Sequence, residues 1–222
     1  MISRQQKALF YTALAVPMRV NASLYRHWLA PRSGTVRVQL GPGREKYLDG
    51  WINVDANFIT AKQDVWADLR NGLPFEDETV DALYSHHVIE HLPDADLPRH
   101  FAEVFRVLKP GGVFRIGGPN GDTACRKLVE GDAEWLGDFP DKRDSIGGKF
   151  ANFILCRGEH LTILTASYLD ELARGAGFPQ TWVQQPTATT RFPEHFDARV
   201  LTTEWESTPE APHTLIIEGQ RH

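Results

Sequence analysis

The sequence predicts an α/β fold organised around a parallel β-sheet. Between residues 36 and 120, short apolar runs alternate with helical segments, and each run ends in a polar or glycine-rich turn. The chain has 222 residues, of which 41% are hydrophobic and 24% charged, which suffices for one well-packed core. We therefore expect one main domain, with its functional residues at the carboxyl ends of the strands.

Residues 1–35 are predicted to form a helical basic arm that precedes the main domain of residues 36–222. The first 44 residues contain seven basic residues and no acidic residue. An edge helix that pairs with the acidic body explains this most simply, although such an arm also suits a phosphate, an acidic partner or weak contact with a membrane surface. Its most apolar part, residues 8–18, is too short to span a bilayer, and Pro17 predicts a break in the helix.

The cysteines and the charge distribution limit the compartment and the partners. Cys125 and Cys156 fit neither a disulfide framework nor a C-x-x-C metal pair, and the sequence has no clear signal-peptide cleavage site. We therefore expect a cytoplasmic protein with reduced thiols. The net charge is -5, and the body carries no basic stripe with interleaved aromatic residues, so nucleic acid is not an expected partner.

Seven segments have the composition of β-strands. They are residues 36–40, 51–54, 64–67, 80–85, 113–116, 181–184 and 214–218. The clearest helix is predicted at residues 96–109, where apolar residues recur at helical spacing, and a second helix surrounds Leu169 and Leu172. Residues 121–160 are charged, rich in glycine and without a clean period, so we expect a long irregular insertion on the substrate side.

Polar or glycine-rich residues follow the first three predicted strands. Gly41-Pro42-Gly43 form a turn that lets backbone approach a ligand, although Lys46 occupies the third glycine position of the dinucleotide-binding fingerprint. Asp55 follows the second strand, where a carboxylate can accept hydrogen bonds from both hydroxyls of a ribose. Asp68 follows the third strand and can accept a hydrogen bond from an adenine amino group, with Leu69 against the ring. Three such features in register favour a binding site over three unrelated loop residues.

These segments resemble the class I S-adenosylmethionine-dependent methyltransferases, in the small type-11-like subgroup. The resemblance is carried by LGPG followed by GWINVD, by LPFEDETVDALYSHHVIEHL and by VFRVLKPGGVFRI, and it resumes at GEHLTILTASYLDELARGAGF and TLIIEG. It implies a Rossmann-like, seven-stranded and mostly parallel sheet with helices on both faces and an antiparallel last strand. It also implies S-adenosylmethionine as the cofactor and S-adenosylhomocysteine as the product.

The same resemblance implies the residues of a cofactor site. They are Gly41, Pro42 and Gly43 at the methionine part, Asp55 and Ala56 at the ribose, Asp68 and Leu69 at the adenine, and Ser85 and His86 near the sulfonium. Because only 11 residues separate Gly43 from Asp55, the helix that usually joins these two strands is expected to be short or absent.

Methyl transfer to a hydroxyl group needs a positioned nucleophile and a general base. The sulfonium already makes the methyl group electrophilic, and a histidine is a suitable base near neutral pH. We expect His87, just past the fourth strand, and His160, after the insertion, to reach the substrate. His91 is a third candidate, although its E-H-L sequence recurs across the family, which favours a structural role.

The segment from His87 to His91 admits other chemistry. It matches H-x-x-E-H, in which His87 and His91 would bind zinc and Glu90 would act as the base of a hydrolase, but such motifs lie inside a long helix. Quinone-biosynthesis O-methyltransferases, to which this region is similar, carry E-x-x-E-H here and can hold a divalent ion. His87 replaces the first of those glutamates. We therefore predict no metal ligand, while a metal that orients a substrate oxygen stays an alternative.

The predicted function is methylation of a hydroxyl group on a sugar, a glycan or another small molecule. The subgroup that the chain resembles often serves the assembly of surface polysaccharides, lipid-linked sugars and natural products. The N/D-P-P-Y/F pattern of many amino-group methyltransferases is absent after the fourth strand. The second hypothesis is a methyltransferase-like scaffold without activity, which the presence of Asp55 and of the glycine turn disfavours.

Overall fold

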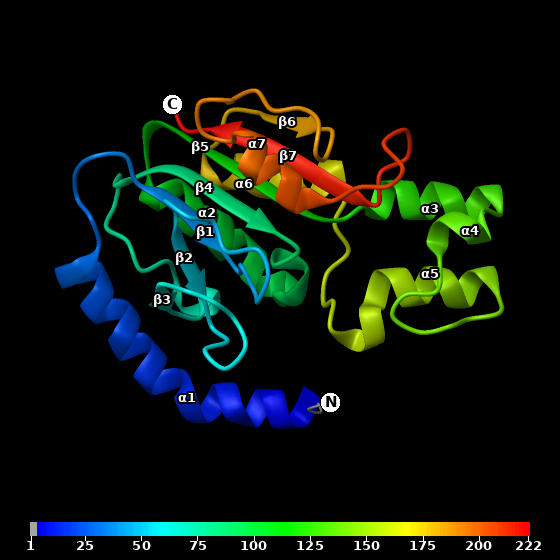
Figure 1. Cartoon of the computed structure of the whole chain (residues 1–222), viewed down its shortest axis with the longest axis horizontal. Helices are drawn as coiled ribbons and strands as arrows, with labels where there is room; N and C mark the ends of the chain where they lie inside the picture. The colour runs from blue at the N-terminus through cyan, green and yellow to red at the C-terminus, as the bar shows by residue number, and fades with distance from the viewer. Residues whose placement is uncertain (1–3) are drawn as a thin grey trace.

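The computed structural model describes residues 4–222, with side chains from residue 11 onward. These residues form a seven-stranded sheet with the strand order β3-β2-β1-β4-β5-β7-β6 (Figure 1). The strands are β1 (Arg37–Leu40), β2 (Ile52–Asp55), β3 (Val65–Trp66), β4 (Val80–His86), β5 (Leu108–Pro119), β6 (Thr181–Gln184) and β7 (Thr214–Gln220). β1 to β5 pair in parallel, and β7 is antiparallel to both β5 and β6. The predicted mostly parallel sheet with an antiparallel last strand is thus confirmed.

Helices surround this sheet. The α-helices are α1 (Arg4–Leu24), α2 (Leu97–Val107), α3 (Gly121–Glu130), α4 (Ala133–Leu136), α5 (Ile146–Leu155), α6 (Ala166–Ala176) and α7 (Ala198–Leu201). Shorter turns are the π-helical η1 (Tyr25–Leu29) and the 3-10 turns η2 (Leu69–Asn71), η3 (Ile89–His91), η4 (Asp94–Asp96), η5 (Cys156–Gly158) and η6 (Thr202–Glu204). α2 has Pro98 in its first turn and ends two residues before the expected residue 109, because Leu108 is already extended and begins β5.

The two faces of the sheet are covered by different parts of the chain. Side chains alternate along β4, so Leu83 faces one apolar core and Tyr84 faces the other. α2 and α6 pack on the first face, where α2 contributes Phe101. The second face is covered by Trp51 and by the segment around α7, which contributes Phe196. Between β1 and β2 the chain makes turns and no helix, as the short spacing predicts.

The N-terminal arm is helical, but the predicted break at Pro17 is wrong. α1 continues through Pro17 to Leu24, and Figure 1 shows the helix bent rather than interrupted. A proline removes one helical hydrogen bond, and here the residues after it pack on the body: Met18 is 1% exposed, and Ala22 and Tyr25 contact the first core. Residues 1–3 of the predicted arm lie outside the described residues. Within residues 4–222, no helix has the length and apolarity needed to cross a membrane.

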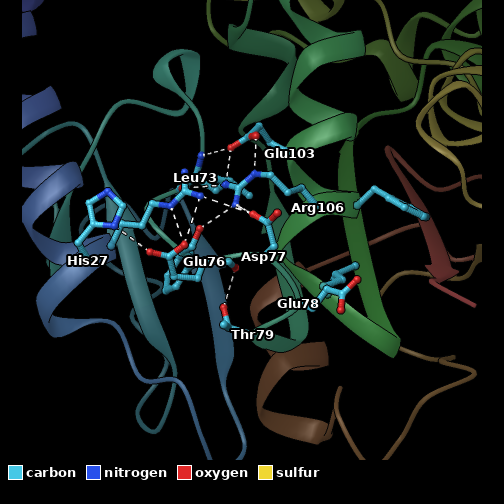
Figure 2. Close-up of polar contacts among 12 residues, drawn as sticks. His27, Leu73, Glu76, Asp77, Glu78, Thr79, Glu103 and Arg106 are labelled. Carbon is cyan, nitrogen blue, oxygen red and sulfur yellow. Dashed lines mark hydrogen bonds and ion pairs between the residues drawn. The ribbon is translucent and has the colours of Figure 1, made fainter.

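The arm contacts an acidic loop of the body through charged groups (Figure 2). Glu76 lies 2.8 Å from Nδ1 of His27 and 3.4 Å from the Arg26 guanidinium. Asp77 accepts a hydrogen bond at 2.7 Å from Arg106 of α2 and lies 3.5 Å from Arg26. This pairing is what an edge helix docked on an acidic body requires, and it uses part of the positive charge of the arm.

Residues 121–160, for which the sequence predicted an irregular insertion, contain three α-helices. They form α3, α4 and α5, which Figure 1 shows grouped beside one end of the sheet. Each helix begins at a side chain that accepts a hydrogen bond from the first turn, and these N-cap residues are Asn120, Asp132 and Ser145. The three helices share a small apolar cluster around Trp135 and Ile154. The polar caps, together with Gly131 and Gly137, are therefore helix boundaries, whereas Gly147 and Gly148 lie in the first turn of α5.

A buried ion cluster fixes the C-terminal segment to the sheet. Arg115 of β5 is fully buried and donates to Glu204 of η6 at 2.7 Å and to Glu218 of β7 at 2.6 Å. Its guanidinium also donates to the carbonyl of Thr189 at 2.9 Å. Because both carboxylates are also fully buried, each of these charges depends on the others for neutralisation.

Candidate active site

A cavity of about 520 Å³ lies at the carboxyl ends of the parallel strands, and we call it the strand-end cavity. Residues from different strand ends line it because the parallel strands finish at the same edge of the sheet. They include Gly41, Asp55, Ala56, Asp68, Leu69 and His87. Five of the nine predicted cofactor residues and two of the three predicted catalytic histidines, His87 and His91, therefore meet around one cavity.

Asp55 ties the glycine turn to the end of β2. Its carboxylate accepts hydrogen bonds from the Gly43 N–H at 3.2 Å and from the Asn57 N–H at 2.8 Å. Burial raises the pKa of Asp55, and these N–H groups oppose the rise. Gly41 has φ +62°, and a Cβ on it would lie 2.4 Å from Val88, so the turn requires glycine there.

At the end of the third strand, Asp68 is hydrogen-bonded to a side chain of the protein, whereas the sequence predicted it to be open to an adenine amino group. Asp68 is 8% exposed, and its two oxygens accept hydrogen bonds from Arg70, including one at 2.7 Å from Nη2. Arg70 also lines the cavity, as does Tyr11 of α1, whose ring lies 5.9 Å from the Arg70 guanidinium. Burial, aided by the charges of Asp55 and Asp68, raises the pKa of Tyr11. No local sequence pattern pointed to Tyr11 or Arg70.

Ser85 and His86 line neither of the two cavities described here, although both were expected near the sulfonium. Both side chains are buried, and Nδ1 of His86 lies 2.9 Å from Nζ of Lys46, behind the wall of the strand-end cavity. Burial lowers the pKa of His86 far below its usual value, with the charges of His87 and Lys46 acting in the same direction. His87, which directly follows β4, is therefore the residue that reaches the strand-end cavity.

His87 stands between two cavities. Its φ of +56° is unusual for a residue with a side chain, and it turns the chain directly after β4. Nδ1 lies 3.0 Å from Oε1 of Glu90, which is a proton acceptor when ionised, and Nε2 lies 3.3 Å from the Thr214 hydroxyl. Burial alone would raise the pKa of Glu90, but the hydrogen bond from His87 and the charges of His87 and His91 outweigh it and lower that pKa. Glu90 is thus held as a carboxylate that orients the His87 ring.

The second cavity has a volume of about 370 Å³, and we call it the aromatic cavity. Trp135 and His213 stack in its wall with ring centroids 4.2 Å apart, and Phe153 lies beside them. Phe139 and Trp205 also line it and remain 79% and 76% exposed. These residues come from α4, α5 and the segment before β7, so no spacing in the sequence predicts their meeting.

The structure also brings the other two candidate histidines close together. His91 lines the strand-end cavity, His160 lines the aromatic cavity, and their ring centroids are 5.1 Å apart. Nδ1 of His91 lies 2.9 Å from the carbonyl of Glu159, and Nδ1 of His160 lies 3.0 Å from the carbonyl of Ile154. Burial lowers the pKa of His160, which favours the neutral ring.

The hydrolase alternative is not supported by this geometry. Residues 89–91 form a single 3-10 turn, so His87 and His91 do not share one face of an α-helix as two zinc ligands would. The ring of His87 instead contacts Glu90 and Thr214.

Comparisons of the sequence find methyltransferases among known proteins. Residues 52–116 match a family described as a methyltransferase domain. A methyltransferase of Mycolicibacterium smegmatis, described as S-adenosylmethionine-dependent, is 35% identical over 115 residues, or 50% of this chain and 35% of that protein. The sterol 24-C-methyltransferase of Schizosaccharomyces pombe is 48% identical over 44 residues, or 20% of this chain and 11% of that protein. The chain thus spans well under half the length of these curated relatives.

Solved structures show the same fold. An S-adenosylmethionine-dependent methyltransferase from Archaeoglobus fulgidus has a TM-score of 0.53 at 15% identity, with 97% of this chain and 99% of that chain covered. One from Thermotoga maritima has a TM-score of 0.52 at 18% identity, with 97% and 96% covered. These likenesses concern the fold. Residues 52–116 match the methyltransferase domain, and in sequence and fold the chain is similar to S-adenosylmethionine-dependent methyltransferases.

Proposed function

We propose that this chain binds S-adenosylmethionine in the strand-end cavity and methylates a hydroxyl group of an acceptor held in the aromatic cavity. The observation that carries the proposal is the position of His87, which lines both cavities. A residue between the two ligands is placed to act on the atom that receives the methyl group. Transfer from sulfur to oxygen requires the donor and the acceptor to meet in line at such a point.

The strand-end cavity suits the adenosine part of the cofactor. Asp55 is the acceptor for the ribose hydroxyls, and Leu69 offers an apolar surface for the adenine ring. Because both oxygens of Asp68 are engaged by Arg70, we assign Asp68 mainly to holding Arg70 at the cavity wall. Tyr11 covers the cavity from α1 and adds an aromatic face beside Arg70.

His87 is the proposed general base. Its Nδ1–H is held by the Glu90 carboxylate, so Nε2 carries the lone pair and faces Thr214, another residue of the aromatic cavity. In the reaction the acceptor hydroxyl gives its proton to Nε2, and its oxygen attacks the methyl carbon. The bond from that carbon to sulfur breaks, and S-adenosylhomocysteine leaves as a neutral thioether. Glu90 stabilises the imidazolium that forms.

The walls of the aromatic cavity indicate the acceptor. Most of the lining surface is apolar and includes the flat rings of Trp135, Phe153 and Trp205, whereas polar side chains such as Asn152 and Glu206 contribute the smaller part of that surface. A polyhydroxylated glycan would need a partner for each buried hydroxyl, so a small molecule with a flat apolar body and one reactive hydroxyl fits better. Of the hydroxyl acceptors that the sequence predicts, we therefore favour a small molecule over a sugar.

We also propose a cytoplasmic location and no nucleic-acid partner. Cys125 is exposed and Cys156 is partly exposed, both as free thiols, which suits a reducing compartment. Trp28 and Leu29 are 82% and 70% exposed at the end of the arm, and they would supply the weak membrane contact suggested by the sequence.

The test combines a binding measurement with a turnover measurement. Calorimetric titration with S-adenosylhomocysteine measures cofactor affinity, and transfer of a labelled methyl group to a panel of phenols, apolar alcohols and sugars measures activity. His87→Gln should keep the affinity within about twofold and lower turnover by roughly 10²- to 10⁴-fold, the usual contribution of a general base. His195→Gln is the matched control, because His195 lines neither cavity. Full turnover of His87→Gln would eliminate His87 as the base, and absence of cofactor binding in the wild type would favour the scaffold hypothesis.

A further inference from the structure

We propose that Glu90, His91 and His160 form a binding site for a divalent transition-metal cation such as Zn²⁺, in the wall between the two cavities. One ligand-capable atom from each side chain lies within 4.8 Å of those from the other two. Two imidazoles and one carboxylate are a donor set that Zn²⁺ and its neighbours in the transition series prefer. This inference goes beyond methyl transfer, which needs no metal ion.

The buried carboxylate is an independent observation that points to a cation. Glu90 is fully buried, and its Oε1 is engaged by Nδ1 of His87. Its Oε2 is also buried and has no hydrogen-bond partner among the residues that the structure describes. A buried carboxylate oxygen without a partner is costly, and a cation beside it supplies the missing interaction.

The two histidines are oriented as metal ligands usually are. In each ring Nδ1 is placed to donate to a backbone carbonyl, that of Glu159 for His91 and that of Ile154 for His160. This fixes the tautomer and leaves Nε2 with its lone pair as the free ligand atom. Sequence spacing alone does not reveal this set, because His160 lies far from the H-x-x-E-H segment and His87 is not one of the three ligands.

Backbone contacts hold the two ligand-bearing segments together. The N–H of Leu161 donates to the carbonyl of Glu90 at 2.7 Å, and the hydroxyl of Thr162 donates to the carbonyl of Leu92 at 3.1 Å. The segment that carries His160 is therefore docked on the turn that carries Glu90 and His91, before any ion binds.

The positions of the three side chains leave the ion accessible. His91 is exposed at the strand-end cavity, and His160 is partly exposed at the aromatic cavity. Three protein ligands leave a fourth position of a tetrahedral ion open, as in catalytic rather than structural zinc sites. That position would take a water molecule or an oxygen atom of an acceptor.

The experiment is a metal titration of the full chain without cofactor or acceptor. Chelator-treated protein is titrated with Zn²⁺ by calorimetry and with Co²⁺ by visible absorption, which reports nitrogen and oxygen ligands directly. We expect one ion per chain, and a loss of affinity of at least about tenfold in His91→Gln and in His160→Gln. His27→Gln is the matched control, because His27 also lies beside a glutamate, at 2.8 Å, but on the arm.

Thermal unfolding with and without Zn²⁺ provides a second readout that does not depend on activity. A site in the folded state raises the melting temperature of the wild type and of His27→Gln, but not that of His91→Gln, whose exposed side chain can be replaced without disturbing the core. Absence of stoichiometric binding, or equal binding by the two ligand variants and the wild type, would overturn the proposal. Neither result depends on methyl transfer, so the proposed function is tested separately.

Discussion

At the residue scale, Asp55 has two tasks at one position. Its carboxylate accepts hydrogen bonds from the N–H groups of Gly43 and Asn57, so it holds the glycine turn against the end of β2. The same carboxylate lines the strand-end cavity, where the ribose of the cofactor is proposed to bind. A neutral amide at this position would lose the charge that strengthens both kinds of hydrogen bond.

We predict that Asp55→Asn weakens binding of S-adenosylhomocysteine by about 10- to 100-fold, because a hydrogen bond to a charged group contributes roughly 1.5–3 kcal/mol. Calorimetric titration measures the change. Asp49→Asn is the control, because Asp49 is exposed and does not line the strand-end cavity. An affinity for Asp55→Asn within about twofold of the wild type would show that the ribose is held elsewhere.

The sequence could predict the site residues that lie at the ends of strands. It could not predict those that reach the cavity from a distant element or whose direction depends on a local turn of the backbone. Asp55 and His87 were accessible to prediction because each comes at or directly after the end of a strand. Ser85 and His86, which were expected near the sulfonium, are buried and line neither cavity, whereas His87, with its positive φ, lines both. Tyr11 belongs to a separate helix, so its place in the cavity depends on tertiary docking alone.

At the scale of elements, α1 packs on the body through one side, although it has apolar residues on both sides. Met18 is 1% exposed against the body, whereas Val16 and Val20, on either side of it, are 67% and 52% exposed. The helix also brings Tyr11 to the strand-end cavity. The arm is therefore part of the core and of the site, so its removal should cost stability rather than spare the sheet.

We predict that Met18→Ala lowers the free energy of unfolding by about 2–4 kcal/mol, through lost burial and the cavity that remains. Val20→Ala, on the exposed side of the same helix, should change it by no more than about 0.5 kcal/mol. Urea denaturation followed by circular dichroism measures both variants. Equal effects of the two substitutions would contradict the docking of α1 through Met18.

The helices of residues 121–160 show a different limit of prediction. Their boundaries are marked by Asn120, Asp132 and Ser145, which are good N-caps but also common loop residues. The helices are short, and α4 contains only four residues, so hydrophobic periodicity has too few turns in which to emerge. What holds them is the shared cluster around Trp135, which a sequence pattern does not display.

At the scale of the whole molecule, the type of sheet was predictable and the cover of the sheet was not. The alternation of apolar runs and helices, together with the family motifs, predicted the parallel sheet and its antiparallel last strand. The cover of the second face depends on Trp51 and Phe196, which stack with centroids 6.2 Å apart and come from distant loops. Loops of this kind carry no periodic signal.

The stability of the whole molecule should depend on pH through His100. This residue of α2 is 3% exposed, and neither ring nitrogen has a hydrogen-bond partner in the described part of the chain. Burial lowers the pKa of His100 to about 4, against a small opposing effect of Glu103. Over the pH range between this lowered pKa and the ordinary histidine pKa of about 6.5, the folded state therefore binds fewer protons than the unfolded state.

We predict that the contribution of His100 lowers the free energy of unfolding by roughly 3 kcal/mol as the pH falls from 7 to 4, at 1.36 kcal/mol for each pKa unit. Above about pH 6.5 the effect vanishes, because the ring is neutral in both states. His100→Leu should reduce the slope of stability against pH, measured by urea denaturation at pH 7, 6 and 5. His222→Gln, at the exposed C-terminus, is the control. The same slope in His100→Leu and the wild type would refute the assignment.

The position of His87 in the walls of both cavities has a thermodynamic consequence. Its ring takes one orientation at a time, so a ligand that fixes this orientation from one side changes the free energy of occupancy on the other. The coupling is reciprocal: the factor by which the cofactor changes the affinity for the acceptor is the factor by which the acceptor changes the affinity for the cofactor. With the cofactor and the acceptor bound as proposed, the apparent dissociation constant of each ligand would therefore depend on the concentration of the other.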